Sequence, residues 1–401
     1  MPDPVGRIPL MKLITLLTFF LLSISCMAGE DENRNVILRG SYSNSQLQFK
    51  GGKTGRVAFM GGSITQMNGY RPMVAAHLQK LFPETKFEFI NAGISSTCST
   101  TGAFRLRSQV LEKGKVDLFF IEFAVNDDQD AGHAYRKCVR GMEGIIRQAR
   151  RAQPKMDMIV THFVNPGMLK DLQSGKMPVP MAAHEEVLKK YAISTIFLAR
   201  EVADRITAGT LTWKKFGGTH PGPVGNAIAA EMIGKLLETD WSKSAAQAQK
   251  DHPIPGKVID QGSYFNGTFL SPAGSANPDW KWQVPNWKKI PGGFRGTFAG
   301  MSLLCVDQPE RQASVQFKGR ALGAYILAGP DAGVIEVSID GGPWKRVDLY
   351  HRYSRGLHYP RTVMFAADLE SKEHTARLRM GKDSNPASKG SAARILQFTV
   401  N

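Results

Sequence analysis

Between Arg56 and Trp241 the sequence alternates short apolar runs with longer amphipathic stretches. The apolar runs are RVAFM (56–60), FEFINA (87–92), VDLFFIEFAV (116–125) and MDMIVTHFV (156–164). The stretches with apolar residues at helical spacing are 71–82, 104–114, 136–153, 182–192 and 225–238. Continuously apolar strands separated by helices are typical of a parallel sheet covered by helices on both faces. We therefore predict a doubly wound α/β domain of the flavodoxin-like kind over residues 55–241.

The pattern changes after a polar segment that ends in two prolines, which we assign as a linker over 242–258. Helical periodicity is nearly absent beyond it, and short strand candidates are separated by Gly, Pro, Asp and Asn. SIDGGPW (338–344) has the composition of a hairpin turn. We predict an all-β, jelly-roll-like sandwich over 259–401 that binds carbohydrate or completes the cleft of the first domain. The strand candidates are 313–319, 321–329, 334–340, 361–368 and 375–380.

The N-terminus has the organisation of a signal peptide over residues 1–28. Arg7 and Lys12 precede the apolar stretch 13–25, and small residues follow, with cleavage expected after Ala28. Residues 29–54 are then a lead-in segment. We expect a secreted or periplasmic protein; lipid anchoring through Cys26 is the less favoured alternative, because Ser23 stands where such signals prefer an aliphatic residue. No later segment is apolar enough to span a membrane.

The net charge of the chain indicates which class of partner it favours. The chain has 51 Lys and Arg against 35 Asp and Glu, a formal net charge of +16. In an exported protein this favours an acidic polysaccharide over nucleic acid, although evenly spread basic residues also serve solubility.

Cys98, Cys138 and Cys305 show no CxxC spacing, so they are free thiols or include one Cys98–Cys138 bridge. We expect no metal site and no cofactor.

Four positions follow predicted strands or precede a helix at the edge where open parallel sheets bind ligands. Ser63 comes after two glycines at the end of RVAFM, as a nucleophile or as the N-cap of the next helix. Gly93 ends the second strand, where its N–H can face an oxyanion or simply form a turn. Asn126 follows the third strand, as an amide donor or a turn former. His220 lies in a Gly- and Pro-rich loop, from which an imidazole could reach a serine as general base.

In this order the four segments resemble the motif blocks of the SGNH (GDSL-like) hydrolases over residues 55–240. MGGSIT carries Ser63, NAGISS carries Gly93, AVND carries Asn126 and THPGPVGN carries His220. The resemblance implies that Ser63 attacks an ester carbonyl after His220 takes its proton. It also implies an oxyanion hole made by the N–H groups of Ser63 and Gly93 and the Asn126 amide.

One position departs from the family pattern. The family has an aspartate three residues before the histidine, and this chain has Gly217. The imidazole is then held by a backbone carbonyl, by a carboxylate from elsewhere, or the esterase is weakened or inactive. Glu122 is the candidate replacement, because a carboxylate within an apolar strand needs a partner. A structural ion pair with Arg105 or Arg107 is the competing explanation for Glu122.

The second half offers candidate substrate-binding residues. Trp280, Trp282 and Trp287 lie among lysines, and His358 lies in a loop, so these side chains could stack against or contact sugars; packing inside the sandwich is the alternative. The sequence thus predicts an exported serine esterase that removes short acyl groups, above all acetyl, from a polysaccharide. A non-catalytic glycan-binding protein, a general lipase or aryl esterase, and an O-acyltransferase are the competing functions.

Overall fold

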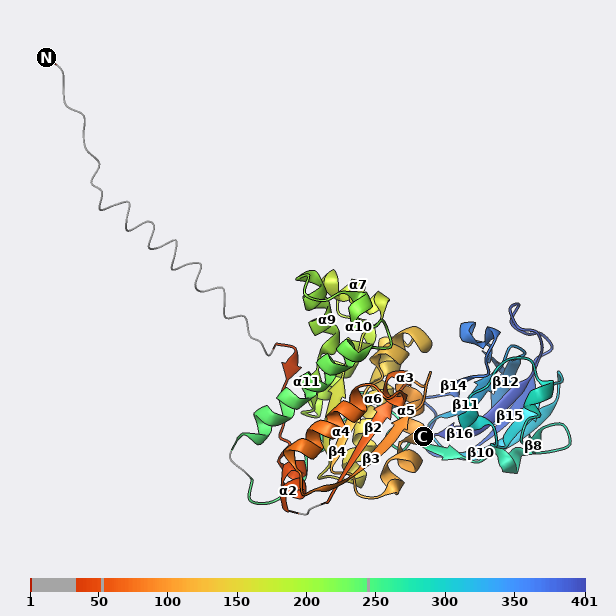
Figure 1. The fold of residues 1–401 in the computed structure, drawn as a ribbon. Coiled ribbons are helices and arrows are strands. Elements are labelled where there is room, and N and C mark those ends of the chain that lie inside the picture. The colour runs from red at the N-terminus through yellow and green to blue at the C-terminus, as the bar shows by residue number, and fades with distance from the viewer. Residues whose placement is uncertain (2–33, 52–53, 244–245) are drawn as a thin grey trace.

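A computed structural model describes residue 1 and residues 34–51, 54–243 and 246–401. It shows an α/β part followed by an all-β part, side by side along the long axis of the molecule (Figure 1). The predicted signal peptide and Cys26 lie outside the described residues. Within the described ranges, no helix combines the length and the apolar character that crossing a membrane requires.

The α/β part contains one six-stranded sheet in the order β1-β6-β5-β4-β2-β3. Strands β2 to β6 run parallel, and only the edge strand β1 is antiparallel to its neighbour β6. A parallel sheet in this order has its switch point between β2 and β4, where open α/β sheets bind ligands. The strands are β1 (Val36–Ile37), β2 (Thr54–Gly61), β3 (Lys86–Gly93), β4 (Leu118–Ile121), β5 (Asp157–Thr161) and β6 (Ser194–Ile196).

Both faces of the central strands are buried, as the continuous apolar runs predict. On β2, Val57 and Phe59 pack into one core, whereas Ala58 and Met60 pack into the other. The first core is closed by α2 (Ser43–Gly51), α4 (Tyr70–Leu81), α7 (Pro166–Gln173), α9 (Leu198–Thr207) and α11 (Pro223–Trp241). The second is closed by α5 (Ser99–Gln109), α6 (Tyr135–Ala152) and α8 (Val179–Lys190). The predicted doubly wound α/β class is confirmed.

Two of the predicted strands differ from expectation. FEFINA forms the sheet edge rather than a buried strand, because β3 is the last strand of the order and Phe89 is 37% exposed. The run 116–125 is a strand only over Leu118–Ile121. Beyond it the backbone turns into helical geometry that leads into the π-helix η2 (Asn126–Asp130), so Glu122 stands just past the strand end.

The all-β part is a sandwich of two antiparallel sheets around a separate apolar core. One sheet has the order β10-β15-β12-β13, and the other β14-β11-β16-β9-β8 with β7 paired to β16. The predicted hairpin joins β12 to β13, with Asp340 and Gly341 at positive φ as a tight turn between such strands requires. The strands are β7 (Thr268–Leu270), β8 (Lys281–Gln283), β9 (Leu303–Val306), β10 (Gln312–Gly319), β11 (Leu322–Ala328), β12 (Val334–Ile339), β13 (Lys345–Asp348), β14 (Tyr359–Ala366), β15 (Lys372–Met380) and β16 (Ala393–Val400).

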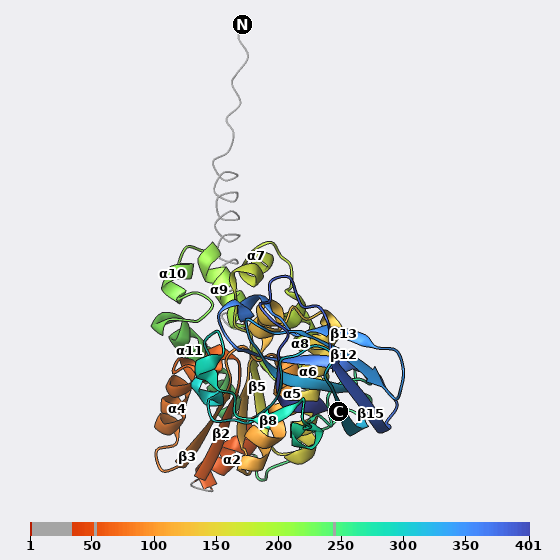
Figure 2. The ribbon, with the colours of Figure 1, turned by 90° about the vertical axis from the view of Figure 1, so that its right-hand side faces the viewer.

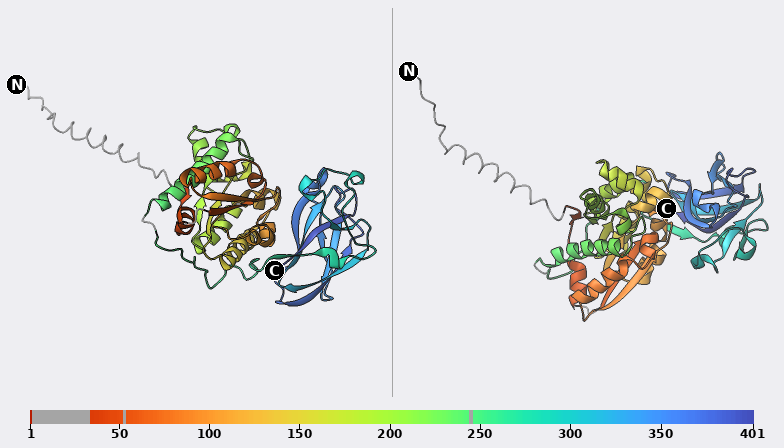
Figure 3. Two further views of the ribbon diagram at one scale, coloured as in Figure 1. Left: turned by 60° about the horizontal axis from the view of Figure 1, so that its bottom comes forward. Right: turned by 45° about the horizontal axis from the view of Figure 1, so that its top comes forward.

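The segment that joins the two parts lies along the α/β part instead of hanging free. His252 is 2.7 Å from the Asp157 carboxylate. The buried Glu143 carboxylate of α6 accepts hydrogen bonds from the Ile259 N–H at 2.7 Å and the Ser263 hydroxyl at 2.6 Å. Figure 2 shows the molecule from the sandwich end, with α5 and α6 behind the sandwich, and Figure 3 shows the C-terminus at the junction of the two parts. At this junction α5 packs against β7 and β14.

Candidate active site

The turn after β2 brings Ser63 to the carboxyl edge of the sheet, as the first residue of the short helix α3 (Ser63–Gln66). Both preceding glycines are required because neighbouring side chains approach their backbone too closely to leave room for a Cβ. A Cβ on Gly61 would lie 2.1 Å from Oε1 of Glu122, and one on Gly62 would lie 2.0 Å from Oδ1 of Asn126. The absence of side chains here lets the end of β4 pack directly against the turn that presents Ser63.

The structure brings Ser63 and His220 together. The Ser63 Oγ lies 2.7 Å from Nε2 of His220, a hydrogen-bond distance, although the residues are 157 positions apart. His220 stands in the loop between α10 (Trp213–Phe216) and α11, and Pro223 starts α11 just behind it. The imidazole is exposed and Ser63 is half-buried, so a substrate can reach both.

Gly217 cannot be replaced by the family's aspartate without moving the backbone. It follows α10 with a φ of +105°, in the left-handed region. A Cβ at this position would lie 1.9 Å from the backbone nitrogen of Gly222. Among the described residues, no side chain hydrogen-bonds Nδ1 of His220. The conformation of the loop therefore fits a glycine at position 217 and leaves no room there for an aspartate side chain.

Glu122 supports the serine turn and does not contact His220. Its Oε1 accepts hydrogen bonds from the Gly62 N–H at 2.8 Å and from the Thr65 N–H and hydroxyl at 3.2 and 2.8 Å. Oε2 is buried with no hydrogen-bond partner. Burial raises the pKa of Glu122 to about 7, against the lowering effect of the hydrogen bonds from Thr65 and Gly62. Its predicted partner Arg105 hydrogen-bonds the Gly61 carbonyl at 2.8 Å instead.

The two other predicted oxyanion residues lie beside the turn. A Cβ on Gly93 would be 2.3 Å from the backbone nitrogen of Gln66, so β3 ends in direct contact with α3. The Gly93 N–H donates to Oδ1 of Asn91 at 3.0 Å, so an oxyanion would compete with this contact. The Asn126 amide lies against Gly62, and its Nδ2 donates to Asp130 at 2.5 Å, which leaves a second N–H on the same nitrogen.

One group of side chains could hold a cation. The ligand atoms of Cys98, Asp127 and His133 lie within 4.8 Å of one another. However, the Asp127 carboxylate accepts hydrogen bonds from the N–H and hydroxyl of Ser99 and is 2.9 Å from Nε2 of His184. Although burial raises it, the hydrogen bonds from His133 and His184 hold the pKa of Asp127 below its usual range. The group thus anchors the start of α5, and Cys98 and Cys138 are free thiols.

The predicted aromatic binding surface on the sandwich is wrong for two of its members. Trp280 and His358 are both 0% exposed, because Trp280 fills the sandwich core and His358 packs beneath Trp287. Trp282 is half-buried against the same core. Trp287 is half-buried, stacks on Phe294 at 4.7 Å and donates its indole N–H to the Ala299 carbonyl. The sugar-binding role of these side chains was predicted from residue type and neighbouring lysines alone, and these do not distinguish a packed ring from an exposed one.

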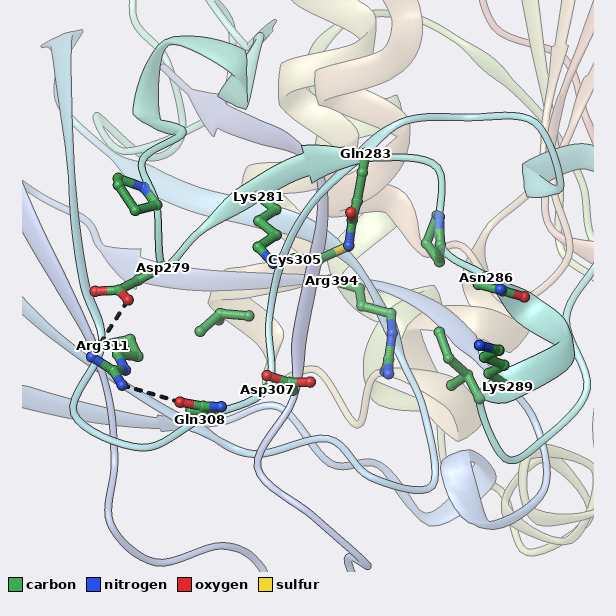
Figure 4. Close-up of a pocket in the computed structure, with 14 residues that line it drawn as sticks. Asp279, Lys281, Gln283, Asn286, Lys289, Cys305, Asp307, Gln308, Arg311 and Arg394 are labelled. Atoms are coloured by element: carbon green, nitrogen blue, oxygen red, sulfur yellow. Dashed lines mark hydrogen bonds and ion pairs between the residues drawn. The ribbon is translucent and has the colours of Figure 1, made fainter.

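The sandwich does carry a polar pocket of about 330 Å³ on the side of β8 and β9 (Figure 4). Its lining contains four cationic side chains, two carboxylates and three amides, and no aromatic ring. Arg394 is fixed in it by a two-pronged ion pair with Asp331 at 2.8 and 2.7 Å. The labelled residues are Asp279, Lys281, Gln283, Asn286, Lys289, Cys305, Asp307, Gln308, Arg311 and Arg394.

Comparison with known proteins agrees with this geometry. The model of the GDSL-like Lipase/Acylhydrolase family matches residues 59–228, which include Ser63, Gly93, Asn126 and His220. The α/β part is a GDSL-like lipase/acylhydrolase domain. The chain therefore contains a carboxylic ester hydrolase domain.

Solved structures extend the likeness over both parts of the chain. A two-domain esterase active on acetylated mannans matches with a TM-score of 0.71 at 20% identity, over 92% of this chain and 98% of that chain. The same esterase co-crystallized with mannopentaose matches with a TM-score of 0.72 at 19% identity, with the same coverage. These matches establish that the GDSL-like domain and the sandwich together form a known two-domain arrangement. No curated protein matches the chain by sequence.

Gly217→Asp tests whether the loop admits a carboxylate. We expect the free energy of unfolding to fall by about 2 kcal/mol or more, because left-handed strain adds to the backbone clash, and esterase activity not to rise. Gly218→Asp is the matched control, since Gly218 has a φ of +85° but no atom within 4 Å of its Cβ position. Denaturant unfolding measures both variants. A Gly217 variant that is as stable as the Gly218 variant and more active would show that the loop can supply the orienting acid.

Glu122→Gln tests the role of the buried carboxylate. The folded-state pKa is raised, so the folded protein binds the proton more tightly, and stability falls as pH rises from about 4.5 to 7. We expect wild type to lose up to about 3 kcal/mol over this window and the glutamine variant to lose none of that amount. Esterase activity should stay within about threefold of wild type. Denaturant unfolding at pH 4.5, 6 and 8 measures the difference, with exposed Glu112→Gln as control; equal slopes in all three proteins would contradict it.

Proposed function

We propose that this protein is an exported serine esterase that removes acetyl groups from a polysaccharide, with Ser63 as nucleophile and His220 as base. The observation that carries the proposal is the 2.7 Å contact between Ser63 Oγ and His220 Nε2 at the carboxyl edge of the sheet. A serine hydroxyl is a weak nucleophile by itself, and an adjacent imidazole that takes its proton activates it.

The chemistry follows from the positions of the side chains. Ser63 Oγ attacks the ester carbonyl while its proton passes to Nε2 of His220. The N–H of Ser63 and the free N–H of the Asn126 amide face the oxyanion, and the Gly93 N–H contributes when the oxyanion replaces Oδ1 of Asn91. As the tetrahedral intermediate collapses and the ester C–O bond breaks, the imidazolium protonates the departing sugar oxygen, which leaves as a hydroxyl. Water, deprotonated by the same imidazole, hydrolyses the acyl-enzyme and releases the acid.

A Ser–His dyad fits the described residues better than a triad. Glu122 is engaged by the turn that carries Ser63, and the conformation of Gly217 excludes the usual aspartate. Since no described side chain hydrogen-bonds Nδ1 of His220, the orientation of the imidazole rests on its contact with Ser63 and on the loop between α10 and α11. The orienting carboxylate accounts for about 10⁴ in kcat where it has been removed from a triad, so a dyad is expected to turn over more slowly than a complete triad.

The substrate class is proposed from the architecture. The structurally similar esterase active on acetylated mannans has the same two domains over nearly its whole length. The polar sandwich pocket, with its amides, carboxylates and cations, offers hydrogen-bonding groups of the kind that hydroxyl-rich chains bind. The formal net charge of +16 favours neutral or acidic chains over basic ones.

Removal of the nucleophile or the base tests the mechanism. Ser63→Ala and His220→Ala should each lower kcat on p-nitrophenyl acetate by at least about 10³-fold, with unchanged unfolding midpoints. The losses are similar because the nucleophile and its base act together in the same step. His77→Ala, on an outer helix beside Glu238, is the control and should keep full activity. Wild-type protein that binds polysaccharide and releases no acetate would instead favour the non-catalytic glycan-binding function.

Substrate comparison tests the specificity. We expect acetate release from acetylated mannan or another acetylated polysaccharide, and kcat/KM for p-nitrophenyl octanoate at least about tenfold below that for the acetate. The measurement is acid release by chromatography. A preference for octanoate would identify a general lipase or aryl esterase, and transfer of acetyl to an added sugar in preference to water would identify an acyltransferase.

A further inference from the structure

We propose that Tyr359 of the sandwich is a positioning residue for the oxyanion hole of the α/β domain, acting through Asp130 on the Asn126 amide. The inference rests on the proposed function and adds to it a catalytic task for the second domain: the sandwich holds the reacting site in shape, in addition to any contact with the polysaccharide.

The relay consists of two short hydrogen bonds, one of which crosses the domain junction. The Tyr359 hydroxyl donates to Oδ1 of Asp130 at 2.6 Å, and Nδ2 of Asn126 donates to Oδ2 of the same carboxylate at 2.5 Å. The two Asp130 oxygens therefore accept from different domains, one from the sandwich and one from the α/β part. Hydrogen bonds to an ionised carboxylate are shorter and about twice as strong as neutral ones, so this carboxylate can fix both groups that it joins.

The Asn126 amide depends on this contact for its orientation. Its Oδ1 is buried with no hydrogen-bond partner, and among the described residues Asp130 is the one group that hydrogen-bonds the amide. The amide is planar, so fixing one N–H on Asp130 also fixes the direction of the second. That second N–H is the group that the proposed mechanism uses as an oxyanion donor, and a donor contributes fully only when it is aimed before the charge develops.

Tyr359 is itself rigidly placed. It is 3% exposed, begins β14 and pairs with Ala328 of β11, and the His351 ring stacks on it at 4.6 Å. Burial and the neighbouring Asp130 carboxylate raise its pKa above the usual range, so the hydroxyl keeps the proton that it donates. The ring that carries the hydroxyl is thus held by strand pairing in the sandwich and by the His351 ring.

A second contact from the sandwich secures the other side of the hole. The Arg295 guanidinium donates to the Ser95 carbonyl at 2.6 Å and to the Ser96 hydroxyl at 2.8 Å, in the loop that follows Gly93. The Ser95 N–H in turn donates to Oε1 of Gln66 at 2.8 Å, which links this loop to the helix that Ser63 begins. Contacts from the sandwich thus reach the segments beside two of the three proposed oxyanion donors, Gly93 and Asn126.

The test is a double-mutant cycle on p-nitrophenyl acetate, a substrate too small to depend on polysaccharide binding. Tyr359→Phe should lower kcat about 5- to 20-fold with KM unchanged, since the ring is kept and only the hydroxyl is lost. Asn126→Ala should lower kcat about 10²- to 10³-fold. In the Asn126→Ala background, Tyr359→Phe should have no further effect, because the proposed path from the Tyr359 hydroxyl to the oxyanion runs through the missing amide.

Tyr353→Phe is the matched control. Tyr353 belongs to the same aromatic cluster, 5.6 Å from Tyr359, but is 42% exposed, and this variant should keep wild-type kcat and unfolding midpoint. An unchanged kcat in Tyr359→Phe, or an equal loss with and without the Asn126 amide, would overturn the inference while the esterase assignment stands. Absence of esterase activity in wild type would overturn the proposed function itself.

Discussion

The packing of the β4 end against the Gly61–Gly62 turn is the contact on which the site depends. The turn has no side chains of its own, so the Glu122 carboxylate and the Asn126 amide occupy the space that two Cβ atoms would fill. Glu122 then accepts hydrogen bonds from the N–H groups of Gly62 in the turn and Thr65 in α3, which have no partner within the helix. A buried carboxylate with one unpartnered oxygen is costly, and it is retained where it fixes the conformation that exposes Ser63.

Much of the fold could be predicted from periodicity, because buried parallel strands must be apolar on both faces and their helices must each present an apolar stripe. The elements that were missed are short or depend on tertiary contacts. The edge strand β1 has two residues, and α10 has four. Glu122 illustrates the limit on boundaries: the apolar run continues past it, yet the strand stops at Ile121 because the backbone must turn to place Asn126 at the serine.

The positions of Ser63, Gly93, Asn126 and His220 could be predicted because each follows a strand or precedes a helix on the same edge of the sheet. Their partners could not. Nothing local in the sequence indicates that Tyr359 donates to Asp130, 229 positions earlier in the chain. The burial of Trp280 could not be predicted either, because the residue type does not show whether the ring points into the sandwich or away from it.

The segment between the domains has a consequence for how the chain unfolds. Its residues fill hydrogen-bonding positions on the α/β domain. Without residues 259–263, the buried Glu143 carboxylate would lose the hydrogen bonds from Ile259, Asp260 and Ser263 and keep the one from the Tyr191 hydroxyl. Asn401, at the other end of the chain, accepts a hydrogen bond from the Asn266 N–H. The start of the all-β part thus supplies buried polar contacts to the α/β part, so we expect the α/β part to lose stability when it is cut off before residue 259.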